Sequence, residues 1–234
     1  MNSSMEREGE ERLVQVTVGA VTLEGNLILP KGASSIVLFA HGSGSSRHSP
    51  RNRYVARLLN QAKLATLLVD LLTSNEEAID MQTAHLRFDI GLLAERLVAV
   101  TDWLTLHPDT RDLRVGYFGA STGAGAALVT AAERAGVVGA VVSRGGRPDL
   151  AGPALPRVQA PTLLIVGGND FPVIELNRAA LAQLCCEKRL VIVPEATHLF
   201  EEPGALDEVA RLAREWFERH LLAMESHPTA AGKP

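Results

Sequence analysis

Cysteine is scarce in this chain of 234 residues, which contains only two. Cys185 and Cys186 are adjacent in the sequence, so they can supply neither an ordinary disulfide framework nor a spaced set of zinc ligands. We therefore expect a protein of a reducing compartment that holds no metal.

Long apolar runs are missing as well. The longest, at residues 36–40 and 64–69, fall far short of the roughly 18 residues that a membrane-spanning helix needs. Residues 1–12 are mostly charged and have no apolar centre, unlike a secretory signal. These observations favour a cytoplasmic protein that does not associate with membranes.

Neither sign of charge dominates. The chain has 23 Lys and Arg against 27 Asp and Glu, which gives a net charge of −4 with no block of like charges. Because nucleic-acid binding leaves a basic footprint, we expect no nucleic-acid partner. The 46% hydrophobic and 21% charged residues are typical of one globular domain and exclude disorder, collagen and coiled coil.

The order of apolar patterns predicts an α/β fold. Two alternating stretches, at residues 14–18 and 23–29, predict an antiparallel hairpin that turns near Gly19 and Ala20. Continuous apolar runs, typical of strands covered on both faces, then alternate with helical patterns. The predicted strands are residues 36–40, 64–71, 113–118, 137–142, 162–166 and 190–193. The predicted helices are residues 52–62, 86–106, 122–135, 173–184 and 204–222.

This alternation predicts a mostly parallel, doubly wound sheet, because parallel neighbours need crossover connections. We place a single domain at residues 13–223 and expect flexible termini at residues 1–12 and 224–234. No internal repeat or linker divides the chain.

A nucleophile motif follows the strand predicted at residues 113–118. The sequence Gly119-Ala120-Ser121-Thr122-Gly123 matches G-x-S-x-G and leads into a run of small residues with helical character. On such a tight strand-to-helix turn, the Ser121 hydroxyl projects above the sheet, next to a helix N-terminus that favours a developing anion. The alternative is an ordinary turn in which this hydroxyl caps the helix, since the pentapeptide alone is a weak signal.

A serine nucleophile needs a general base and an acid that orients it, and in sheets of this kind the chain order is serine, acid, histidine. Asp170 follows the strand at 162–166, and His198 follows the last strand. Because parallel strands end at one edge of the sheet, we expect Ser121, Asp170 and His198 to meet there. Asp149 is a second candidate acid, and Asp170 could instead cap the next helix.

The first parallel strand leads into His41-Gly42-Ser43-Gly44-Ser45-Ser46. Such small residues let backbone amides approach a ligand, and we expect the amides of Ser43 and Thr122 to form an oxyanion hole. A phosphate-binding interpretation is disfavoured, because neither G-x-x-x-x-G-K-S/T nor G-x-G-x-x-G occurs there.

Several arginines fall in loops at the same edge of the sheet: Arg47, Arg51, Arg53, Arg144 and Arg147. A guanidinium binds a carboxylate in bidentate fashion, so Arg47 and Arg144 are candidates to bind a substrate carboxylate. The alternative is that these arginines are solvated or pair with Asp70, Asp149 or nearby glutamates.

Together these residues resemble the α/β-hydrolase superfamily, and specifically its dienelactone-hydrolase-like branch. The resemblance rests on residues 41–44, 119–123, Asp170 and Thr197-His198, and it covers nearly the whole chain. It implies a serine hydrolase that acts on esters or lactones through an acyl-enzyme, without a cofactor. One departure matters: dienelactone hydrolases use a cysteine nucleophile, whereas this elbow carries Ser121, so lactone specificity does not follow from the fold.

The resemblance also bears on the size of the substrate. Only residues 143–161 separate the two strands between which many esterases and lipases insert a cap domain, so we expect no cap domain and a shallow, open site. The expected partner is a small-molecule ester or lactone, and the expected assembly is a monomer or homodimer. Two alternatives stay open: acyl transfer or perhydrolysis on the same triad, and a non-catalytic binding protein.

Overall fold

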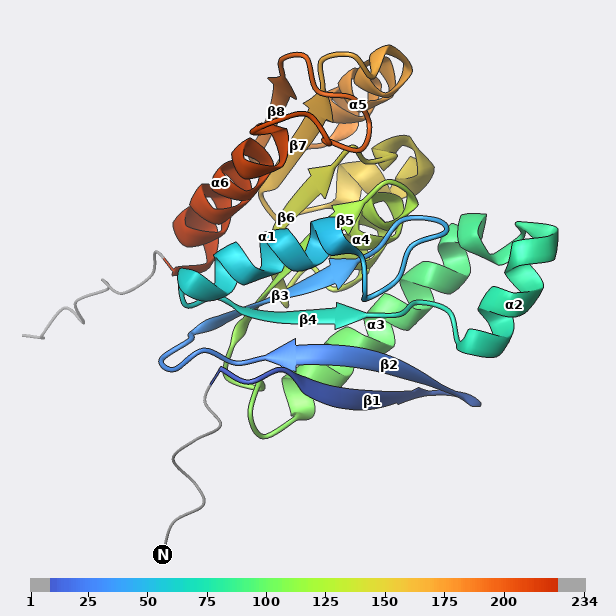
Figure 1. Cartoon of the computed structure of the whole chain (residues 1–234), viewed down its shortest axis with the longest axis vertical. Coiled ribbons are helices and arrows are strands. Elements are labelled where there is room, and N and C mark those ends of the chain that lie inside the picture. The colour runs from blue at the N-terminus through green and yellow to red at the C-terminus, as the bar shows by residue number, and fades with distance from the viewer. Residues whose placement is uncertain (1–8, 223–234) are drawn as a thin grey trace, which may run out of the picture.

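A computed structural model of the chain describes residues 9–222 and is built around one eight-stranded sheet, with strand order β1-β2-β4-β3-β5-β6-β7-β8 (Figure 1). The strands are β1 (Arg12–Val18), β2 (Val21–Ile28), β3 (Ser35–Ala40), β4 (Ala65–Val69), β5 (Arg114–Ala120), β6 (Val138–Arg144), β7 (Thr162–Gly167) and β8 (Lys188–Val193). The hairpin β1–β2 is antiparallel and pairs antiparallel with β4, while all other neighbours are parallel. The predicted mostly parallel sheet opened by a hairpin is confirmed. The predicted flexible termini lie largely outside the described residues.

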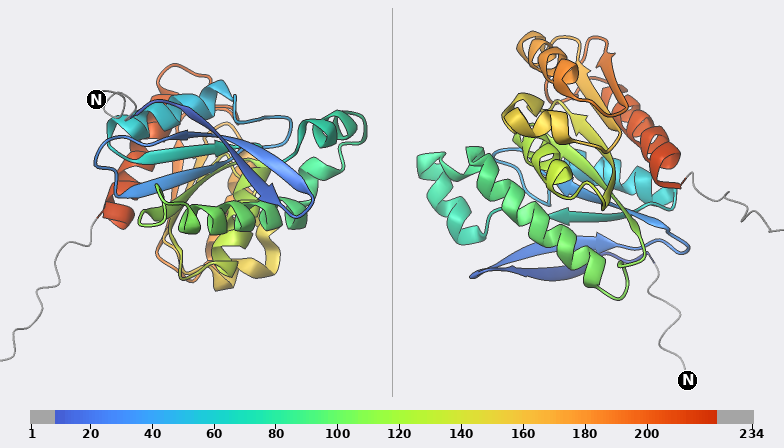
Figure 2. Two further views of the ribbon diagram at one scale, coloured as in Figure 1. Left: turned by 90° about the horizontal axis from the view of Figure 1, so that it is seen from below. Right: turned by 180° about the vertical axis from the view of Figure 1, so that it is seen from behind.

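Helices cover both faces of the sheet (Figure 2). On one face lie α1 (Pro50–Gln61) and α6 (Ala205–Phe217), which pack against each other. On the other face lie α3 (Ile90–Leu106), α4 (Thr122–Glu133), the 3-10 segment η2 (Pro148–Arg157) and α5 (Phe171–Gln183).

The strand β3 shows why its residues form an unbroken apolar run. Ile36 and Leu38 pack into the core beneath α3 and α4, whereas Val37 and Phe39 pack into the core beneath α1 and α6. Both faces are therefore buried, as a parallel strand with helices on each side requires.

Two helical segments were not predicted. The helix α2 (Ser74–Thr83) leaves Ile79 and Met81 exposed and presents no apolar stripe, so periodicity could not reveal it. The segment η2 contains Pro153 and Pro156, which argue against a helix when read from sequence.

The helix predicted at residues 86–106 is divided in two. A short 3-10 turn, η1 (Leu86–Phe88), comes first, and Asp89 then caps α3 by accepting a hydrogen bond from the Leu92 amide at 3.0 Å. No helix within residues 9–222 is both long and apolar enough to cross a membrane.

Candidate active site

Ser121 occupies a sharp turn between β5 and α4. Its backbone has φ 49° and ψ −123°, a strained conformation for a residue with a side chain. Gly123 makes the turn sterically possible, because a Cβ there would lie 2.3 Å from the carbonyl oxygen of Ala40. The Ser121 side chain makes no hydrogen bond that caps α4. In this structure the hydroxyl therefore has no helix-capping role.

Asp170 and His198 come together from the ends of β7 and β8. The Asp170 Oδ2 atom lies 2.6 Å from Nδ1 of His198, and the Asp170 side chain makes no bond that caps α5. The carboxylate is 12% exposed and the imidazole 38%. With the Nδ1 proton directed at the carboxylate, Nε2 is left free to accept a proton.

Backbone contacts hold the two loops against each other. The Asn169 amide donates to the carbonyl of Ala196 at 2.9 Å, and the Gly168 amide donates to that of Val193 at 2.8 Å. The second candidate acid, Asp149, is bound to Arg147 instead of to His198. Both of its oxygens accept hydrogen bonds from Arg147, at 2.8 and 2.9 Å.

A cavity of about 260 Å³ brings most of the predicted residues together. Its lining consists of Gly42, Ser43, Ser45, Ser49, Arg51, Ala120, Ser121, Arg144, His198 and Leu199. We call it the serine cavity. Ser45, Ser49 and Leu199 were not singled out from sequence. They lie close to predicted residues along the chain, but nothing in their own pattern signals exposure to a cavity.

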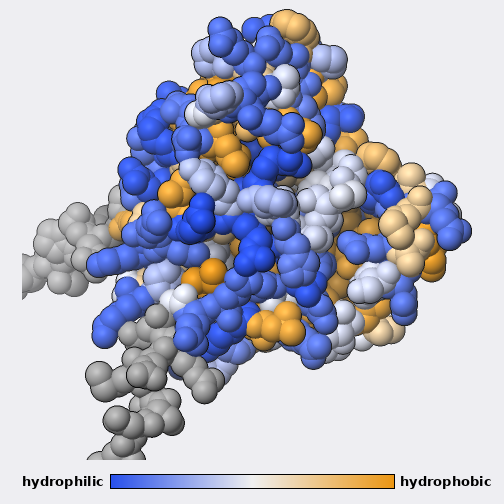
Figure 3. Space-filling view, in the orientation of Figure 1, coloured by the Kyte–Doolittle hydropathy of each residue, from blue (hydrophilic) through white to orange (hydrophobic). Residues whose placement is uncertain are grey.

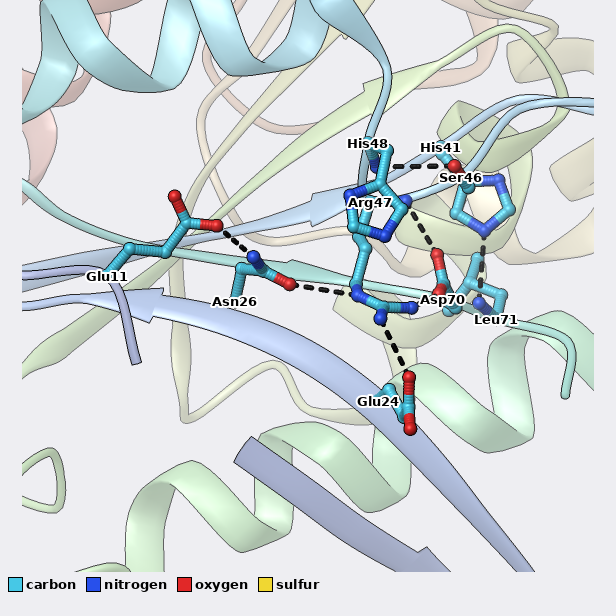
Figure 4. A network of polar contacts seen from close by, with 9 residues as sticks. All are labelled: Glu11, Glu24, Asn26, His41, Ser46, Arg47, His48, Asp70 and Leu71. Atoms are coloured by element: carbon cyan, nitrogen blue, oxygen red, sulfur yellow. Dashed lines mark hydrogen bonds and ion pairs between the residues drawn. The ribbon is translucent and has the colours of Figure 1, made fainter. Parts of the chain in front are cut away.

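The loop that contains Ser43, residues 41–46, is held by side-chain contacts and is called the oxyanion loop below. The Leu71 amide donates to Nε2 of His41 at 3.0 Å (Figure 4), and Nδ1 of His41 lies 2.9 Å from the Gly42 carbonyl. Burial lowers the pKa of His41, which keeps the ring neutral and able to accept. The Ser43 amide donates to the Thr122 hydroxyl at 3.0 Å. The two residues expected at the oxyanion hole are therefore in contact.

Arg47 does not line the serine cavity. Its guanidinium forms ion pairs with Asp70 and, at 2.7 Å, with Glu24, and it donates to Asn26 at 2.9 Å (Figure 4). These partners neutralise the guanidinium and turn it toward β2. Arg47 thus pairs with nearby carboxylates, as the alternative interpretation predicted. Its guanidinium is not free to bind a substrate. Arg51, Arg53 and Arg147 also form ion pairs, with Glu201, Glu11 and Asp149.

Arg144, which was expected in a loop, is the last residue of β6 and differs from the other arginines named above. Its side chain lines the serine cavity, the residue is only 7% exposed, and within residues 9–222 no carboxylate lies at ion-pair distance. Its Nη2 donates to Asn52 at 3.3 Å, while Nε is buried without a hydrogen-bond partner. Burial, followed by the nearby charge of Arg51, lowers its pKa to about 10. At neutral pH it is therefore a buried cation without a counter-ion.

Residues 9–222 contain no group of three or more His, Cys, Asp and Glu side chains arranged to hold a metal ion.

Known proteins of similar sequence share this arrangement of elements. The model of the dienelactone hydrolase family matches residues 31–227. A crystal structure of a dienelactone hydrolase from Anabaena variabilis is 70% identical, covers 92% of this chain and 99% of its own, and superposes with a TM-score of 0.90. The structure of Est1E from Butyrivibrio proteoclasticus is 15% identical, with a TM-score of 0.76 over 90% of this chain and 99% of its own, and shows the fold alone.

A longer relative carries a different name. A Mycobacterium tuberculosis protein with a phosphoribosyl transferase name is 61% identical over 208 residues, which are 89% of this chain and 46% of that protein. The chain therefore spans about half the length of the curated relatives it matches.

Proposed function

Because the chain belongs to the dienelactone hydrolase family, we propose that it is a serine hydrolase that cleaves small carboxylic esters or lactones through an acyl-enzyme. The observation that carries the proposal is the 2.6 Å contact between Asp170 and His198 at the sheet edge where Ser121 stands on its strained turn. The serine cavity, lined by both Ser121 and His198, gives an ester access to them.

The chemistry follows the roles of a Ser-His-Asp triad. Nε2 of His198 accepts the proton of the Ser121 hydroxyl as Oγ bonds to the ester carbonyl carbon. The imidazolium then donates that proton to the departing alcohol oxygen, which leaves the acyl group on Ser121. A water molecule then attacks the acyl carbon with His198 as the base. The acid is released as Ser121 takes back its proton from His198. Asp170 orients the ring and stabilises its charged form without taking the proton.

The negative carbonyl oxygen needs hydrogen-bond donors. We assign this role to the backbone amides of Ser43 and Thr122. The Thr122 amide is at the start of α4, where the first amides have no partner within the helix and the helix dipole favours an anion. The Ser43 amide donates to the Thr122 hydroxyl in this structure, and the substrate oxygen would take the place of that hydroxyl.

Arg144 is proposed as a substrate-binding residue. A buried guanidinium has lost its hydration, and an anionic group of the substrate would restore its missing partner. Its place in the lining of the serine cavity, together with its unpaired Nε, supports this role. Arg47, which is neutralised by carboxylates, is not included.

The triad supplies nucleophile, base and anion stabilisation from the chain itself, so we propose no cofactor or metal. The phosphoribosyl transferase name belongs to a protein of which this chain spans 46%. The cytoplasmic location, the absence of nucleic-acid and membrane partners and the monomeric or dimeric state stay predictions.

Labelling with a fluorophosphonate, read by intact mass and peptide mapping, tests the proposal. We expect one adduct per chain on Ser121 and none in Ser121→Ala, together with turnover of short p-nitrophenyl esters. No adduct on folded protein would contradict the proposal and favour a binding protein. Product analysis with competing acceptors distinguishes hydrolysis from acyl transfer or perhydrolysis.

A further inference from the structure

A second cavity, of about 320 Å³, lies on the other side of the oxyanion loop. We call it the α2 cavity. Gly42 and Ser43 line both cavities, and Thr122 lines this one. Gly42 also packs directly against the nucleophile, because a Cβ added to it would lie 2.9 Å from Cβ of Ser121. The α2 cavity therefore begins one residue from the reacting serine, although neither Ser121 nor His198 lines it.

Most of the surface that the α2 cavity exposes is apolar, although serines of the oxyanion loop and charged side chains such as Asp80 and Arg87 also line it. Leu72 and Leu93 line it from the core and are buried, whereas Ala78 and Met81 line it from α2. The helix stands out from the body of the molecule at the right of Figure 1, and Figure 3 shows apolar side chains among hydrophilic ones on this part of the surface. Such a lining suits an apolar group rather than a hydrated one.

Both ends of α2 are anchored, which makes the cavity preformed. At the first turn, Thr73 and Glu76 form a capping box, and Arg96 donates to both oxygens of Glu76, at 2.5 and 2.7 Å. In the last turn, Asp80 accepts hydrogen bonds from the amides of Leu86 and Arg87, which follow the helix, at 2.7 and 3.1 Å. The cavity does not depend on a segment that closes upon binding.

The one carboxylate in this lining without an ion pair is Glu77. Asp80 pairs with Arg87, whereas Glu77 forms no ion pair with any residue in the range 9–222. Burial and the charge of Asp70 raise its pKa, and the Arg47 guanidinium nearby is already neutralised by Glu24 and Asp70. A second negative charge in this cavity would be repelled.

We propose that the α2 cavity binds the acyl part of the substrate and selects an uncharged, apolar acyl group of modest length. This inference rests on the proposed hydrolase function. His198 must donate its proton to the departing oxygen, so the alcohol leaves on the side of the serine cavity, where His198 lies. The acyl group then extends in the other direction, past Gly42, which lines both cavities.

This assignment revises the expected shallow site. The chain has no inserted cap domain, and the outer wall of the cavity is α2, in the segment after β4, and not residues 143–161. The volume of about 320 Å³ is near the lower end for ligand pockets, which suits a short chain better than a fatty acyl group.

The test compares p-nitrophenyl acetate, butyrate and hexanoate with the mono-p-nitrophenyl ester of adipic acid, which has the length of hexanoate and a terminal carboxylate. In the unaltered protein we expect kcat/KM to rise from acetate to butyrate by up to about fifteenfold, since butyrate has two more methylenes and each buried methylene contributes about fourfold. The adipate half-ester should be at least about tenfold poorer than hexanoate, and Glu77→Gln should narrow that gap several-fold.

Two substitutions on α2 form a matched pair. Ala78→Phe fills the cavity and should lower the hexanoate-to-acetate ratio about tenfold. Gln82→Phe adds the same ring to an exposed position of the same helix outside the lining, and should leave the ratio unchanged. Equal effects of the two variants, or no dependence on acyl length in the unaltered protein, would overturn the assignment. Absence of both ester turnover and Ser121 labelling is a different result, which overturns the hydrolase function and the acyl site together.

Discussion

The carboxylate of Asp170 lies 2.6 Å from Nδ1 of His198, although the two residues are 28 positions apart in the sequence. The other acid considered, Asp149, has both oxygens bound to Arg147 and none on a histidine. Substitution of each acid can therefore show which of them orients His198.

Asp170→Asn should lower kcat for p-nitrophenyl butyrate on the order of 10⁴-fold, because an amide can donate to Nδ1 and so hold the wrong histidine tautomer. Circular dichroism should show an unchanged fold. Asp149→Asn is the matched control and should keep kcat within about twofold, since it loses only a partly exposed ion pair. If Asp149→Asn removes the activity and Asp170→Asn keeps it, the acid has been assigned wrongly.

The contact between Gly42 and the nucleophile predicts a catalytic defect. In Gly42→Ala the new Cβ would stand 2.9 Å from Cβ of Ser121 and 3.1 Å from the carbonyl oxygen of Ala120, so the oxyanion loop must shift. Because the loss of one oxyanion donor costs about 10²–10³ in kcat, we expect a decrease of at least about tenfold. Gly136→Ala, which meets no atom within 4 Å, should leave kcat unaltered. Equal kcat values for the two variants would contradict the prediction.

Arg144→Gln should discriminate between charged and neutral substrates. A hydrogen bond to a charged group contributes about 1.5–3 kcal/mol, so KM for an ester with a carboxylate in its alcohol part should rise roughly tenfold or more relative to the neutral ester. Arg147→Gln, in the loop that follows β6 and outside the serine cavity, serves as the control. An unchanged ratio of KM values in Arg144→Gln would rule out the anion-binding role.

Arg47 should contribute to stability. In Arg47→Met the carboxylates of Asp70 and Glu24 lose their partner, and the Asp70 pair is only 15% and 13% exposed. We expect the free energy of unfolding to fall by about 3 kcal/mol, as when a buried pair is broken. The surface pair of Arg53 with Glu11 is the comparison, and Arg53→Met should cost about 0–1 kcal/mol in urea unfolding. Equal losses would mean that burial of the Arg47 pair contributes nothing.

His41 should make stability depend on pH. Burial lowers the pKa of His41 in the folded state below 6.5, its ordinary value in the unfolded chain. Between these two pKa values the unfolded state binds more protons than the folded state, so acidification favours unfolding. The stability is therefore fully present above pH 6.5 and is lost as pH falls through the lowered pKa. Urea unfolding from pH 7.5 to 5 should show this loss, and His41→Gln should show less of it. Taking the difference between the two proteins removes the contribution of His220, whose pKa is also lowered by burial. Identical pH slopes would contradict this role.

Much of the fold could be predicted, because buried parallel strands have a recognisable sequence pattern. Continuous apolar runs such as residues 36–40 and 162–166 reflect burial on both faces, which is a local property of the sequence. The helix α2 could not be predicted in this way, because it is held by polar contacts such as that between Glu76 and Arg96 and buries no apolar stripe. Its place beside the oxyanion loop depends on packing, not on periodicity.

The sequence predicted that Ser121, Asp170 and His198 meet at one edge of the sheet. Each follows a strand, and parallel strands all end at the same edge. The sequence also determined the strained elbow, through glycines where a Cβ would collide with the backbone. The sequence did not distinguish Arg47 from Arg144, since its pattern places both in loops after a strand. Only tertiary structure decided that Arg47 pairs with Glu24 of β2 and with Asp70, just after β4, while Arg144 is buried without a carboxylate partner. Which charged residues surround a side chain depends on contacts between positions far apart in the sequence. Those contacts exist only in the folded chain.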